Sequence, residues 1–177
     1  PRLRLLALAP NPDTAYVLRF ATESVQPLLG GFGLELGRPG GWTWEAGGAP
    51  LAALLQRPDR SKLGYDVKAL ALLLEEGGID LRPPWFDVAA AGYVLDPARH
   101  GSTLEALVAQ YAEAPLPGPP AATALRGGRA ALLEYAGSRA AALHGLRERQ
   151  VALLAAEHLQ TLFAEGEMPL MEVALDI

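Results

Sequence analysis

The sequence of 177 residues contains no cysteine, which excludes disulfide bonds, thiolate metal sites and cysteine nucleophiles. Lysine is almost absent as well, because Lys62 and Lys68 are the only two and the other strong bases are arginines. The formal net charge is -5 at pH 7, whereas tight binding to nucleic acid needs many basic side chains against the phosphates. Any contact of this chain with DNA is therefore expected to be weak or shared with another domain.

Long apolar runs are also missing. None approaches the roughly 20 residues needed to cross a bilayer, and no charged-then-apolar leader opens the chain. We therefore expect a cytoplasmic protein without a membrane partner. The chain begins at Pro1 without an initiator methionine, which predicts that it is part of a longer protein. Half of the residues are apolar, so a single folded domain with a real core is predicted.

Strand patterns occupy the first part of the chain. Residues 3–10 are apolar but short, and predict a strand or one helical turn. Residues 15–20 are aromatic and branched between two polar segments, and predict the first strand of a sheet. Residues 31–36 and 41–45 have alternating faces around a Pro-Gly turn, which predicts a hairpin.

Helical patterns dominate the remainder. A short helix is predicted over 50–56, a short strand over 61–64 and a helix over 67–76 that ends at Gly77 and Gly78. Two prolines predict an extended connector over 79–84. Asp66 and Asp87 each stand where a helix should begin, and the simplest role of such a carboxylate is to cap the free backbone N–H groups.

The last third predicts three further helical segments. Ser102 and Glu105 form a capping-box pattern before a helix with a buried apolar stripe, and residues 114–128 hold four prolines and three glycines, which predicts a loop. From Arg129 a long helical period follows, with a break or bend expected near Gly137 or Gly145. The segment 166–169, which contains Gly166 and Pro169, is predicted to interrupt this helical period, and another helix is expected from 170 onward.

Several common functional motifs are absent. The histidines His100, His144 and His158 lack a carboxylate at metal-ligand spacing, so solvated or core histidines are predicted. The glycines at 30–33 and 47–48 lack the strand, turn and helix context of a phosphate cradle. No Gly-x-Ser-x-Gly elbow exists for an acyl-transfer serine.

Four blocks of the sequence carry a family resemblance. They are Lys-Leu-Gly-Tyr-Asp-Val-Lys-Ala-Leu at 62–70, Phe-Asp-Val to Tyr-Val-Leu-Asp-Pro at 86–97, Thr-Leu-Glu-Ala-Leu-Val-Ala-Gln-Tyr at 103–111 and Glu-Met-Pro-Leu at 167–170. In this order they resemble the proofreading 3′–5′ exonuclease domain of bacterial DNA polymerase I, over most of the chain. The resemblance implies an exonuclease-like domain over 1–166 and the start of a junction to a polymerase domain over 167–177. It also implies an α/β (α+β) fold of the ribonuclease-H-like type, with a mixed sheet and helices on both faces.

The resemblance also implies where metal ligands should stand. Active members of this family hold two divalent metal ions with four carboxylates, which activate water and stabilise the leaving oxygen. The family's Asp-x-Glu motif is matched by Ala21 and Glu23, so its aspartate is lost. Its second motif is matched by Asp66. Its third motif, a tyrosine followed four residues later by an aspartate, is matched by Tyr135 and Arg139, so that acid is lost too.

Two of the four ligands are thus missing by this match, and the guanidinium of Arg139 would repel a divalent cation. The resemblance therefore implies a DNA polymerase I domain that has lost its exonuclease activity, in which Glu23, Asp66 and Tyr135 are vestiges and no metal is held. Its role would be to support the polymerase domain in the same chain and to help position DNA, at the nucleoid.

Two alternatives remain open at this stage. The first is an active proofreading exonuclease, in which Glu23 and Asp66 would bind Mg²⁺ or Mn²⁺. The second is a stand-alone interaction domain unrelated to polymerases, which the acidic charge and the helical second half both permit.

Overall fold

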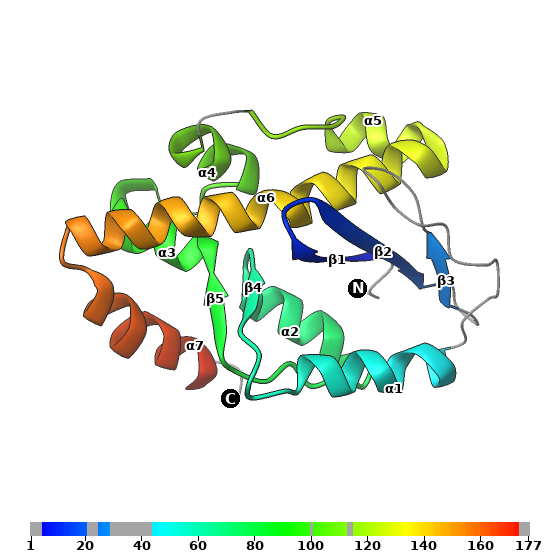
Figure 1. Cartoon of the computed structure of the whole chain (residues 1–177), viewed down its shortest axis with the longest axis horizontal. Coiled ribbons are helices and arrows are strands. Elements are labelled where there is room, and N and C mark those ends of the chain that lie inside the picture. Colours follow the sequence, from blue (N-terminus) through cyan, green and yellow to red (C-terminus); the bar gives the residue numbers. More distant parts are fainter. Residues whose placement is uncertain (1–4, 21–24, 29–43, 100, 113–114, 174–177) are drawn as a thin grey trace.

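The computed structural model describes residues 5–20, 25–28, 44–99, 101–112 and 115–173 (Figure 1). Its strands are β1 (Leu5–Asn11), β2 (Thr14–Phe20), β3 (Val25–Leu28), β4 (Lys62–Gly64) and β5 (Trp85–Asp87). Its helices are α1 (Trp44–Leu55), α2 (Val67–Glu75), α3 (Val88–Leu95), α4 (Leu104–Tyr111), α5 (Ala121–Arg126), α6 (Gly128–Ala156) and α7 (Met168–Val173). A 3₁₀ turn (Pro97–Arg99) follows α3, and a π-helical turn (Leu162–Glu167) precedes α7. The class is mixed α/β, as predicted.

The described strands form two separate sheets. One is an antiparallel meander in the order β1-β2-β3, and the other is the parallel pair β4-β5. This differs from the predicted single mixed sheet with helices on both faces. The structural reason is that α6 runs along the molecule and contacts β1, β2 and β4, so one long helix connects two sheets that share no strand pairing among the described residues (Figure 1).

The meander is built from other segments than those predicted. The apolar run at the start is a strand, β1, so the predicted strand over 15–20 is the second of its sheet. Of the predicted hairpin, residues 31–36 and 41–43 lie outside the described residues. Trp44 and Glu45 begin α1, which contradicts a strand there. The helix is favoured because Leu51 and Leu55, four residues apart, are both buried in the core.

The middle of the chain follows its predicted pattern closely. The strand over 61–64 and the helices after Asp66 and Asp87 are confirmed as β4, α2 and α3, and Gly78 has the positive φ (76°) that a helix end needs. Strand β5 was not predicted. Thr103, not Ser102, caps α4 by accepting from the Ala106 N–H at 3.2 Å.

Three predicted interruptions are wholly or partly helical in the structure. The Pro-rich segment 114–128 contains α5, and α6 runs for 29 residues through Gly137 and Gly145 without the break that was predicted near one of them. Gly137 has a packing role instead, because a Cβ there would lie 3.4 Å from the Cβ of Ala15 in the β1–β2 hairpin. Near 166–169 the chain stays helical, because the π-helical turn (Leu162–Glu167) runs directly into α7, and Pro169 lies within this continuous helical run.

The main core lies where β4 and β5 meet the helices around them. Its most deeply buried members include Leu74 of α2, Val88 and Ala91 of α3, and Leu146 of α6. A smaller cluster of Val17, Leu133 and Ala136 joins β2 to the other half of α6. Within the described ranges, no helix has the length and apolar character needed to span a membrane.

Candidate functional site

The start of α2 places Asp66 at the surface. Its side chain accepts the Ala69 N–H at 3.2 Å, so the predicted cap is confirmed. The backbone of Asp66 is left-handed, with φ 52° and ψ 62°. That conformation is uncommon for any residue with a side chain other than Asn and Asp, and it costs on the order of 1 kcal/mol or more. The chain therefore turns sharply between β4 and α2, and presents this carboxylate to solvent.

The start of α3 places Asp87 in the core, where the residue is 2% exposed. Its carboxylate caps α3 by accepting the N–H groups of Ala89 (2.7 Å) and Ala90 (3.4 Å). It also accepts the N–H groups of Asp66 (3.1 Å) and Val67 (2.6 Å), at the start of α2. One carboxylate thus satisfies free donors at the N-termini of two helices.

Burial raises the pKa of Asp87 above its ordinary value of 3.8, because the low-dielectric core disfavours the charged carboxylate. The four backbone N–H donors oppose this change by stabilising the charge, yet burial outweighs them. Asp87 is therefore a structural group whose oxygens are already occupied. Its predicted role as a helix cap is confirmed, and the connection to α2 extends it.

A third acid, Glu105 of α4, lies close to this corner. The Tyr65 hydroxyl donates to the Ser102 carbonyl at 3.0 Å, which ties the β4–α2 turn to the segment before α4. The pKa of Tyr65 is raised, first by burial and then by the negative charges of Asp66, Asp87 and Glu105. Three acidic residues, each at the start of a different helix, therefore give this corner a negative charge.

Arg139 of α6 supplies the positive charge. Its Nε and Nη2 atoms donate to Oε1 of Glu105 at 3.1 and 2.9 Å, and Nη1 donates to the Tyr135 carbonyl at 3.1 Å. The guanidinium carbon lies 3.6 Å from the centre of the Tyr135 ring, which is a close cation–π contact. The Arg139 side chain is only 13% exposed, so this guanidinium is held in place by three partners.

The structure locates some of the site residues predicted from the sequence and not others. Asp66, Tyr135 and Arg139 are placed, and Glu105 connects Arg139 to the Tyr65 corner. Ala21 and Glu23 lie outside the described residues, so the first motif is not located. Across the described ranges, no three His, Asp or Glu side chains form a group that could hold a metal ion. That the domain holds neither Mg²⁺ nor Mn²⁺ stays a prediction.

The structure places two of the three histidines, His144 and His158. His144 Nε2 lies 2.9 Å from the Ala9 carbonyl and so joins α6 to β1. His158 has a positive φ of 58° just after α6 and is exposed. His100 lies outside the described residues. The prediction that His144 and His158 are core or solvated agrees with these positions.

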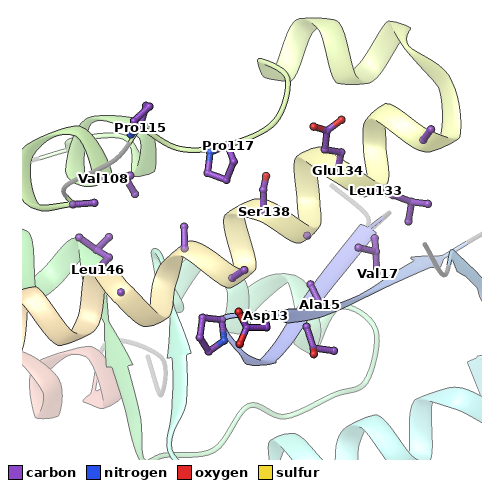
Figure 2. Close-up of a pocket in the computed structure, with 18 residues that line it drawn as sticks. Asp13, Ala15, Val17, Val108, Pro115, Pro117, Leu133, Glu134, Ser138 and Leu146 are labelled. Carbon is purple, nitrogen blue, oxygen red and sulfur yellow. The ribbon is translucent and has the colours of Figure 1, made fainter. Parts of the chain in front are cut away.

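A large cleft of about 790 Å³ lies on a different face of α6 (Figure 2). The β1–β2 turn borders it on one side and the Pro115–Pro117 segment on the other, and small α6 residues such as Gly137 and Ala141 form its floor. Its charged lining residues are Asp13 and Glu134, both acidic. An apolar cleft with two carboxylates and no cation does not suit a phosphate group.

Sequence reasoning missed the second role of Asp87 and the part played by Glu105. One signal for Asp87 was present, because a charged residue inside the apolar run Trp85-Phe86-Asp87-Val88 has to be buried with partners. Glu105 was read as a capping-box member, whereas it pairs with Arg139 in another helix. No local pattern could show a contact between residues 34 positions apart.

Comparison with known proteins gives a structural match only. No protein-family model matches the chain, and no curated protein matches it. A solved structure of the POL domain of Pol1 from M. smegmatis, in complex with a DNA primer-template and dNTP, is similar with a TM-score of 0.61 and 19% sequence identity. The match covers 99% of this chain and 28% of that chain. At this identity the likeness concerns the fold, and this chain corresponds to about a quarter of the other.

Proposed function

We propose that this chain is a degenerate 3′–5′ exonuclease-like domain of a DNA polymerase I. In this proposal it has lost metal-dependent hydrolysis and serves as a structural and DNA-positioning module for a polymerase domain in the same chain. The ribonuclease-H-like architecture, the domain limits 1–166 and 167–177 and the association with the nucleoid belong to the same proposal.

The fold match supports the polymerase part of the proposal. The similar structure is a polymerase I domain with bound primer-template, and nearly the whole of this chain takes part in the match. The sequence blocks at 62–70, 86–97, 103–111 and 167–170 point independently to the same protein class. The charge of -5 and the acidic lining of the large cleft argue against tight DNA binding by this chain alone, so the proposal assigns DNA contact mainly to the polymerase domain.

The environment of Arg139 is the observation that supports the proposed loss of activity. The resemblance expects a metal-binding carboxylate at this position, four residues after Tyr135. The side chain present is a cation, and Glu105 and the Tyr135 ring hold it in place. A divalent ion near this guanidinium would meet repulsion, and the charge of Glu105 is already partly neutralised by its ion pair with Arg139.

The direct test is a nuclease assay on the 177-residue chain. Single-stranded DNA labelled at its 5′ end is incubated with the protein and Mg²⁺ or Mn²⁺, beside a sample containing EDTA. We expect equal fragment patterns with and without metal. Sustained shortening from the 3′ end would overturn the proposal if Glu23→Ala and Asp66→Ala abolish it while the matched surface variant Glu157→Ala retains it.

The polymerase context has its own test. The reading frame that encodes this chain is sequenced beyond Ile177. We expect it to encode the motifs of a DNA-directed DNA polymerase. A stop codon at that point would contradict this part of the proposal, and would favour a stand-alone interaction domain.

A further inference from the structure

The cleft of about 790 Å³ beside α6 has no role of its own in the proposed function (Figure 2). Its volume lies within the range of roughly 300–1,000 Å³ that is usual for small-molecule sites in proteins. Most of its lining is apolar, and the large apolar side chains come from β2, α4 and α6: Val17, Val108, Leu133 and Leu146. The cleft therefore has the size and the lining of a site for an apolar small molecule.

Gly145 leaves the floor of this cleft open. It lies inside α6, where glycine destabilises a helix relative to alanine. Close packing accounts for Gly137, because a Cβ there would contact Ala15. A Cβ at Gly145 would meet no heavy atom of another part of the described structure within 4 Å. The fold itself therefore does not require glycine at position 145, and the missing side chain leaves space in the cleft.

Two polar side chains lie together at one border of the cleft. Ser138 is 3% exposed and donates its hydroxyl proton to the Tyr135 carbonyl at 3.1 Å, so its oxygen is left as an acceptor. Glu134 lies one helical turn earlier, and both side chains point toward the side of Pro117 (Figure 2). A Cβ at Gly118 would lie 3.0 Å from Ser138 Oγ and 3.4 Å from Glu134 Cγ, so the two groups are close neighbours. This border presents a carboxylate and a hydroxyl oxygen to a ligand.

The charge of the lining is negative at both borders. Asp13, in the β1–β2 turn, lies on the border opposite Glu134 (Figure 2), and no arginine, lysine or histidine is among the described lining residues. Neither acid has an ion pair among the described residues, in contrast to three other acids that each pair with an arginine, namely Asp59, Asp80 and Glu105. An anionic ligand would add a third negative charge to an apolar cleft, where charges repel more strongly than in water. A cationic ligand would meet an unneutralised carboxylate at either border.

We propose that this cleft binds a small apolar amine in its ammonium form. The apolar body lies over Ala141 and Gly145, and the ammonium group donates to the Glu134 carboxylate and to the Ser138 oxygen. Such a ligand contacts the β1–β2 hairpin, α6 and the Pro115–Pro117 segment together. The inference goes beyond the proposed function and does not depend on it, since none of these residues belongs to the Arg139 corner.

The ligand class is tested by NMR on the 177-residue chain with three probes of the same shape. They are 4-phenylbutylamine, which is a cation at pH 7, the neutral 4-phenylbutanol and the anionic 4-phenylbutyrate. The backbone amide resonances of Gly137 and Gly145 are followed during each titration. We expect a saturable displacement with the amine, binding about fivefold weaker for the alcohol, and binding weaker still for the acid.

Two variants locate the site. Gly145→Leu places a side chain in the open floor and should weaken the binding of the amine and of the alcohol by at least about tenfold. Glu134→Gln should weaken the amine about threefold and leave the alcohol unchanged, because it removes only the charge. Glu148→Gln, on α6 outside the lining, is the matched control and should bind both probes like the parent. Urea unfolding checks that each variant is folded, and the exposed position of Glu134 keeps the test decisive if Gly145→Leu is destabilised.

Three results would overturn the inference. The first is the absence of a saturable displacement with the amine, and the second is equal affinity for the three probes. The third is parent-like binding by folded Gly145→Leu, or an equal loss of amine and alcohol binding in Glu134→Gln. The nuclease assay and the reading frame beyond Ile177 test the proposed function separately, so either proposal can fail while the other stands.

Discussion

The starts of α2 and α3 share one local sequence and differ in almost every structural respect. Each has an aromatic residue, an aspartate and a valine, at Tyr65-Asp66-Val67 and Phe86-Asp87-Val88. Asp66 is exposed with a left-handed backbone, whereas Asp87 is buried with an extended backbone. Asp66 caps its own helix with one hydrogen bond, and Asp87 accepts four from two helices.

This difference shows that the same capping pattern can satisfy one backbone donor or four, according to where the aspartate lies. Asp87 ends β5, and Gly64 at the end of β4 is its register partner in the parallel pair. The α2 turn follows Gly64 directly, so its free N–H groups come within reach of Asp87. The buried carboxylate therefore organises both helix starts, including the one that contains Asp66.

The largest expected effect tests this asymmetry. Asp87→Ala should lower the free energy of unfolding by about 3 kcal/mol, because it leaves backbone donors unsatisfied at two helix N-termini. Urea unfolding followed by circular dichroism measures the change. Asp13→Ala, an exposed aspartate in the β1–β2 turn, is the control and should stay within about 0.5 kcal/mol of the parent. Equal losses for the two variants would contradict the role given to Asp87.

A second, smaller effect concerns pH. The folded-state pKa of Asp87 is raised, so between 3.8 and that pKa the folded state binds more protons than the unfolded state. The contribution of this titration to stability is thus fully present below 3.8 and is lost as the pH rises through the raised pKa. The stability of the parent minus that of Asp87→Asn should therefore fall from pH 3 upward. A difference that grows with pH would mean that the hydrogen bonds outweigh burial.

The smallest effects are expected at Asp66. Asp66→Ala should cost about 1 kcal/mol, because it removes the cap and leaves a left-handed alanine. Asp66→Gly also removes the cap, but glycine adopts φ 52° without strain, so its cost should be about 0.5 kcal/mol or less. Thermal unfolding of both variants measures the difference. If alanine is no worse than glycine, backbone strain at this turn is negligible.

The same contrast shows how far sequence reasoning reaches. The helices after Asp66 and Asp87, the strand β4 and the turn at Gly78 were predicted because their signals are local: caps, apolar spacing and a glycine end. The separation into two sheets, the short strand β5 and the Arg139–Glu105 pair depend on contacts between distant residues. The break predicted near Gly137 or Gly145 is absent because helix propensity is a weak preference, and at Gly137 the packing against the hairpin outweighs it.

The length of α6 has a consequence for cooperativity. Its 29 residues span about 43 Å as one rod. Along it, His144 contacts the Ala9 carbonyl of β1, and Gln150, fully buried, donates to the Val88 carbonyl of α3 at 2.9 Å. Because the two sheets share no strand pairing in the described part of the chain, α6 is the element that contacts both of them. If α6 unfolded at its centre, the β1–β2 hairpin could open while the β4–β5 core stayed folded. Hydrogen exchange would then show two separately opening units, whereas the intact helix makes the two regions open as one.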